Sequence, residues 1–159
     1  MIDVINVQRK IKLETAVYRE FVRELSTSVE EADGKAFSVA FISDDRMRKL
    51  NSTFRGKNST TDVLSFPMSE PPAFAGGQPV DLESTNWPPA DADDPDFLGD
   101  IVISAEQADK QAKENKLSLE NELKQLILHG LLHLCGYDHE TDKGQMNKRE
   151  LALRRTLNI

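Results

Sequence analysis

Cysteine and long apolar segments are scarce in this chain of 159 residues. Its single cysteine, Cys135, excludes an internal disulfide, so the fold must be stabilised by its core. No stretch approaches the ~20 apolar residues that a membrane span needs. The first ten residues contain no basic segment followed by an apolar run, which is the pattern of a secretory signal. We therefore expect a cytoplasmic protein with no membrane partner, about the size of one domain.

Basic residues are absent from residues 58–109, which hold eleven of the 27 acidic residues. The other 16 acidic residues stand against 20 basic ones, so the rest of the chain is positive although the whole chain has a net charge of −7. A negative protein is a poor partner for nucleic acid. Because the charge is segregated, the overall value does not exclude RNA.

Hydrophobic patterns predict one α+β domain over residues 1–159, with a small sheet of about four strands and helices packed on it. Strands are expected at 2–7, 37–42, 62–66 and 98–104. The helix that begins after Ser118 is apolar almost all round, so we expect it to be buried and central. A last helix should run from about 142 to 157 and pack Met146, Leu151, Leu153 and Leu157 on the core. Six of the seven prolines fall in a long acidic surface loop at about 68–97.

All three histidines, His129, His133 and His139, lie within eleven residues. Residues four apart on a helix share a face, so the first two imidazoles can share one metal ion. Gly136 is suited to end the helix in a left-handed turn, and the reversal would carry His139 back toward them. Three protein nitrogens leave one tetrahedral position open. The spacing therefore predicts a catalytic metal site on the central helix and the turn after it. Imidazole ligands favour zinc, although another divalent ion fits too.

The spacing His-x3-His-x2-Gly-x2-His matches the frame of the metzincin peptidases, with one difference. Gly130 stands where those enzymes carry the glutamate that serves as general base. A metallopeptidase is thus an alternative that the spacing favours and Gly130 opposes. Cys135 is either a fourth ligand or, as we favour at the end of a leucine-rich helix, a small buried residue. Asp138 is available to orient a ligand or act as an auxiliary base, and is equally suited to a plain turn.

Arg55 lies in an expected loop, within a basic patch made of Arg46, Arg48, Lys49, Arg55 and Lys57. Most surface charges are simply solvated. A guanidinium near a metal site would, however, match the oxygens of a phosphate and stabilise charge that develops on them. Spacing alone does not place Arg55 beside the histidines.

Four blocks follow one another along the chain: Asn51-x3-Arg55-Gly-Lys, Thr61-Asp-Val-Leu-Ser-Phe-Pro67, Leu98-Gly-Asp-Ile-Val-Ile-Ser104 and His129-Gly-x-Leu-His133-Leu-x-Gly136-Tyr-Asp-His139. In this order they resemble the blocks of the YbeY family of bacterial rRNA-maturation endoribonucleases. The long proline-rich loop is the main departure from that family.

The resemblance implies one zinc ion held by His129, His133 and His139, and an Arg55 that is required to cleave single-stranded RNA. It also implies 16S rRNA 3′-end maturation and ribosome quality control in the cytoplasm, with the ribosomal small subunit and associated assembly proteins as partners. We predict a zinc-dependent endoribonuclease with Arg55 and His129 as catalytic residues. The alternatives are the metallopeptidase and a non-enzymatic, metal-stabilised ribosome assembly factor. We make no prediction of oligomeric state.

Overall fold

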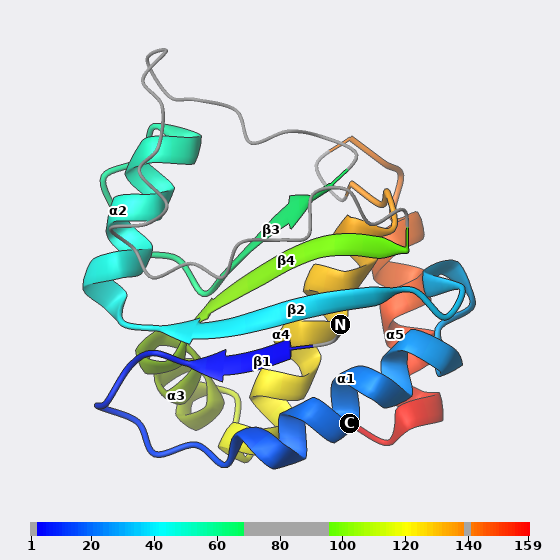
Figure 1. Cartoon of the computed structure of the whole chain (residues 1–159), viewed down its shortest axis with the longest axis horizontal. Helices are drawn as coiled ribbons and strands as arrows, with labels where there is room; N and C mark the ends of the chain where they lie inside the picture. Colours follow the sequence, from blue (N-terminus) through cyan, green and yellow to red (C-terminus); the bar gives the residue numbers. More distant parts are fainter. Residues whose placement is uncertain (1–2, 69–95, 139–140) are drawn as a thin grey trace.

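A four-stranded sheet forms the centre of the fold, with helices on both faces (Figure 1). The computed structural model describes residues 3–68, 96–138 and 141–159. Within these ranges the elements are β1 (Asp3–Asn6), α1 (Thr15–Ser28), the 3-10 helix η1 (Glu30–Ala32), β2 (Ala36–Ile42), α2 (Asp44–Arg55), β3 (Val63–Pro67), β4 (Phe97–Ser104), α3 (Ala105–Glu114), α4 (Leu119–Leu134) and α5 (Gln145–Leu157). No helix in the described ranges is long and apolar enough to cross a membrane.

The sheet is mixed, with the strand order β1-β2-β4-β3. β1, β2 and β4 are parallel, and β3 runs antiparallel to β4 at one edge. The central strands β2 and β4 are almost continuously apolar, as expected of strands covered on both faces. The four predicted strands and the α+β class are confirmed, with each strand boundary that lies in the described ranges within a residue or so of the expected one.

Helix α4 is the central element of the larger core. Its side chains Leu123, Ile127, Leu128 and Leu131 are fully buried and belong to the same apolar cluster as Ile101 of β4. Helices α1 and α5 pack beside it on this face of the sheet (Figure 1). The helix begins after Ser118 as predicted, and the Ser118 side chain caps it by accepting a hydrogen bond from the backbone N–H of Asn121. The prediction of a buried central helix is therefore confirmed.

Helix α2 covers the opposite face, where Met47 and Leu50 pack in a smaller apolar cluster. The expected loop position of Arg55 is wrong, because this residue is the last of α2, which is capped by Gly56 with φ +68°. The helix continues because Phe54 extends the apolar face formed by Met47 and Leu50. Its ring packs edge-on against Phe66 of β3, with the two ring centroids 4.8 Å apart.

Helix α5 places one predicted core residue on the wrong side. Leu151 is 46% exposed, whereas Met146 and Leu153 are buried as expected. The buried side of α5 follows the spacing Met146, Glu150, Leu153, so Leu151 falls on the opposite face. The helix also begins at Gln145, three residues later than expected.

The predicted proline-rich loop at 68–97 falls mostly outside the described residues, which omit 69–95. Phe97, expected at its end, is instead the first residue of β4.

Candidate active site

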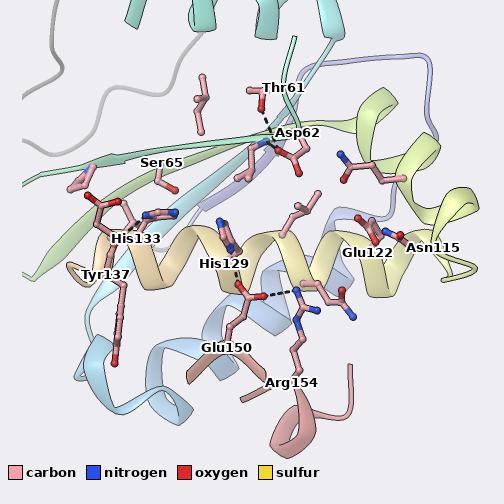
Figure 2. Close-up of a pocket in the computed structure, with 18 of the residues that line it drawn as sticks. Thr61, Asp62, Ser65, Asn115, Glu122, His129, His133, Tyr137, Glu150 and Arg154 are labelled. Atoms are coloured by element: carbon pink, nitrogen blue, oxygen red, sulfur yellow. Dashed lines mark hydrogen bonds and ion pairs between the residues drawn. The ribbon is translucent and has the colours of Figure 1, made fainter. Parts of the chain in front are cut away.

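His129 and His133 extend from α4 into one cavity of about 1140 Å³ (Figure 2). Their ring centroids lie 4.9 Å apart, as expected for residues separated by about one helical turn. His139, the third predicted ligand, lies outside the described residues. Within the described ranges, no group of three or more His, Cys, Asp and Glu side chains is arranged to hold a metal ion. The three-histidine site therefore stays a prediction.

The Nδ1 atom of each ring is held by a protein acceptor. His129 Nδ1 lies 2.6 Å from Oε1 of Glu150, and His133 Nδ1 lies 3.0 Å from the backbone oxygen of Tyr137. These bonds favour the tautomer in which Nδ1–H donates and Nε2 carries the lone pair. Metal-ligating histidines commonly donate their other ring N–H to such an acceptor. Both residues thus fit a metal ion bound through Nε2.

Glu150 is a site residue that the sequence analysis missed. Its side chain is 8% exposed, and its second carboxylate oxygen accepts a hydrogen bond from Arg154 at 2.5 Å. Burial disfavours the charged carboxylate, but the hydrogen bonds from His129 and Arg154 and the positive charge of Arg154 outweigh it and lower the pKa of Glu150. A glutamate on the buried face of α5, in line with Met146 and Leu153, was the available signal.

The turn after α4 has the geometry that Gly136 was expected to give. Gly136 has φ +104°, and its N–H donates to the carbonyl of His133 at 3.0 Å. The N–H of Tyr137 donates to the carbonyl of Leu132 at 3.1 Å, which completes a Schellman motif. This motif places the Tyr137 carbonyl where His133 Nδ1 contacts it.

Tyr137 is also anchored at its other end. Its hydroxyl donates to Glu31 at 3.0 Å, and Arg149 donates two hydrogen bonds to the same carboxylate, at 2.9 and 2.8 Å. The hydrogen bond from Arg149 is the main cause that lowers the pKa of Glu31 to about 2. The turn that carries the His133 acceptor is thereby tied to η1 and α5.

Arg55 lines the same cavity as the two histidines, so the fold brings together what spacing alone did not. Asn51 and Asp44 of α2 hold the chain that follows: Asn51 Nδ2 donates to the carbonyl of Ser59 at 2.8 Å, and Asp44 accepts from Thr60 at 2.9 Å. Of the predicted basic patch, Arg55 alone is among the described residues that line the cavity.

Cys135 and Asp138 take different positions around the turn. Burial raises the pKa of the Cys135 thiol to about 11, and this residue is not among the described residues that line the cavity. Its half-buried position against the core supports a small apolar role. Asp138 does line the cavity, and its backbone carbonyl accepts from Asp142 at 3.0 Å, as in a turn.

Gly130 is packed against the sheet. A Cβ atom at this position would lie 2.8 Å from Cγ2 of Ile101, and the Gly130 carbonyl accepts from Ser65 at 3.2 Å. A glutamate at position 130 would therefore run into β4, away from the cavity. The position that carries the base of a metzincin is closed to a long side chain in this fold.

The fold and the cavity together define a small α+β protein in which paired imidazoles and an arginine line one polar cavity, an arrangement suited to hydrolysis of an anionic substrate. The family model of endoribonuclease YbeY matches residues 3–158, so the chain belongs to this family. The resemblance found in the four sequence blocks is confirmed.

Individual relatives agree with the family match. The endoribonuclease YbeY of Clostridium botulinum is 36% identical over 165 residues, which cover 100% of this chain and 99% of that protein. That of Alkaliphilus oremlandii is 41% identical over 124 residues, or 77% of this chain and 72% of the relative. A solution structure of a Thermotoga maritima protein matches 96% of this chain and 85% of its own, with TM-score 0.57 and 24% identity, which supports the fold alone.

Proposed function

We propose that this protein is a metal-dependent endoribonuclease that cleaves single-stranded RNA. The observation that carries the proposal is the shared cavity of Arg55, His129 and His133, in a chain that belongs to the endoribonuclease YbeY family. A peptidase is not favoured, because Gly130 faces Ile101. A non-enzymatic assembly factor is not favoured, because the family to which the chain belongs is described as one of endoribonucleases.

One zinc ion is proposed to be held by His129, His133 and His139, where it would supply Lewis-acid stabilisation of the phosphate. Glu150 keeps the Nδ1 proton on His129, and the Tyr137 carbonyl does the same for His133. Both acceptors hold their rings in a fixed orientation, so little reorganisation is needed when a ligand binds.

Arg55 is proposed to bind the scissile or a neighbouring phosphate. A guanidinium offers planar donors that match phosphate oxygens and stay charged at any physiological pH. Arg55 ends α2 and lines the same cavity as the histidines of α4, so an RNA backbone that enters the cavity could contact both helices.

The proposed setting is rRNA processing in the cytoplasm, at the 3′ end of 16S rRNA and in ribosome quality control. Partners would be the ribosomal small subunit and its assembly proteins. This part of the proposal is supported by the resemblance of the four sequence blocks to the family of rRNA-maturation enzymes.

Cleavage of labelled single-stranded RNA by wild-type, Arg55→Ala, His129→Ala and Lys49→Ala proteins tests the activity. Lys49 is the matched control, because it is an exposed cation of α2 that does not line the cavity. We expect the first two variants to lose about 100-fold or more of the rate, and Lys49→Ala to stay near wild type. Equal activity in all four proteins would indicate a contaminating nuclease and overturn the proposal.

Elemental analysis of protein purified without a histidine tag tests the metal. We expect about one zinc ion per chain, lost in His133→Ala. A stoichiometry near zero that added zinc does not restore would overturn the metal site. The result of the RNA cleavage assay would not depend on that outcome.

A further inference from the structure

One end of the cavity is lined by two carboxylates and two amides that the proposed cleavage does not use. We name Asp62, Gln111, Asn115 and Glu122 the acceptor subsite. Figure 2 shows Asn115 and Glu122 at the end of the cavity opposite His133 and Tyr137, with Asp62 between the two ends. The subsite therefore lies on the far side of His129 from the turn after α4.

Three side chains of the subsite, those of Asp62, Gln111 and Glu122, form one network. With its amide nitrogen turned toward the carboxylates, Gln111 donates to Asp62 Oδ2 at 3.3 Å and to Glu122 Oε1 at 3.2 Å. Asp62 Oδ1 accepts from the backbone N–H of Val63 at 2.8 Å. One amide thus holds two carboxylates at the wall of a cavity.

Glu122 is the unusual member. The residue is 4% exposed, and its Oε2 atom is buried without a hydrogen-bond partner among the described residues. Leaving a buried acceptor unsatisfied costs on the order of 1–3 kcal/mol, and more when it is charged. The helix dipole of α4 favours a carboxylate in the first turn but does not require it to be buried. Glu120 lies in the same turn, and its side chain is 52% exposed. Glu122 lines the cavity, so a donor that enters the cavity could satisfy this atom.

The chemistry of the subsite selects that donor. Gln111 turns its amide nitrogen toward both carboxylates, where a shared divalent cation would have to lie, so the subsite suits N–H groups better than such a cation. A carboxylate has two oxygens and accepts from two adjacent donors. Guanine presents such a pair, N1–H and N2–H, on its Watson–Crick edge, whereas adenine, cytosine and uracil place an acceptor beside their donor. Unpaired bases are the ones that proteins recognise on this edge.

We propose that the acceptor subsite binds a guanine base of the RNA, with Glu122 as the residue that determines this preference. The inference rests on the proposed endoribonuclease function and adds a sequence preference to it. A carboxylate that is exchanged for an amide keeps its shape but presents a donor to guanine N1–H or N2–H, so Glu122→Gln removes the recognition.

Cleavage of a randomised single-stranded RNA, followed by sequencing of the products, tests the preference. For the wild-type protein we expect guanosine enriched about 5-fold or more at one fixed position relative to the cut. Inosine at that position, which lacks the N2 amino group, should slow cleavage, whereas 7-deazaguanosine, altered on the other edge, should not. This comparison needs no variant and stands even if Glu122→Gln does not fold.

Glu122→Gln and its control Glu120→Gln complete the experiment, with melting temperatures measured for both. We expect Glu122→Gln to cleave all sequences alike and Glu120→Gln to retain the guanosine preference. A loss of rate that is equal for every RNA would indicate a structural role and overturn the inference. Cleavage without guanosine enrichment in the wild type, or enrichment that survives in Glu122→Gln, would overturn it as well. If the wild type neither binds nor cleaves any RNA, the proposed function itself fails.

Discussion

Gly130→Ala would place a methyl carbon 2.8 Å from Cγ2 and 3.0 Å from Cδ1 of Ile101. Gly130 and Ile101 are both buried where α4 packs on β4, so neither the new methyl group nor the Ile101 side chain has solvent to move into. Overpacking of this kind costs about 1–3 kcal/mol. Alanine is favoured over glycine inside a helix by about 1 kcal/mol, which offsets part of the loss. The single variant should therefore be destabilised by up to about 2 kcal/mol, the difference of these two magnitudes.

A double-mutant cycle separates the two effects. Ile101→Ala removes the three carbon atoms that the new methyl group meets, at a cost of its own of about 2–5 kcal/mol. In that background Gly130→Ala should stabilise the protein, because the helix propensity remains and the clash is gone. Urea unfolding of the four proteins should give a coupling energy of about 1–3 kcal/mol.

Ile103→Ala provides the control, because Ile103 lies two residues along β4 on the same face and is equally buried. Gly130→Ala should cost the same in that background as in the wild type. Additivity of Gly130→Ala and Ile101→Ala within about 0.5 kcal/mol would refute the packing argument. It would also reopen position 130 to a side chain and weaken the case against a peptidase.

Three further predictions concern charge, reactivity and backbone. Arg149→Gln should lower the free energy of unfolding at pH 7 by about 1–2 kcal/mol after allowance for solvent screening. Because the pKa of Glu31 is lowered to about 2, this stabilisation is present above about pH 4.5 and lost as the pH falls toward 2; urea titrations with the same deficit at pH 2 and 7 would contradict it. The Cys135 thiol, whose pKa is raised to about 11, should react with iodoacetamide at pH 8 much more slowly in native protein than in urea; equal rates would argue against its burial. Gly99→Ala should cost about 3 kcal/mol or more, since its φ is +141° and a Cβ would lie 2.3 Å from the carbonyl oxygen of Phe66, and an unchanged melting temperature would disprove this.

Short-range patterns were sufficient for most elements. The start of α4 after Ser118 and the left-handed turn at Gly136 follow from residues within one or two turns, and the structure has both. The shared face of His129 and His133 follows from helical periodicity in the same way. The errors at Arg55 and Leu151 arose where a helix end and a helix face depend on what the helix packs against, which for α2 includes the Phe54–Phe66 contact.

The sequence by itself determined the strands, the buried central helix, the pair of histidines and the family to which the chain belongs. Tertiary structure alone decided what surrounds those histidines. Glu150 reaches His129 across 21 residues of sequence, and Arg55 and Glu122 reach the same cavity from α2 and from the far end of α4. Such contacts depend on how α2, α4 and α5 pack on the sheet, and no periodicity of 2 or 3.6 residues encodes that packing.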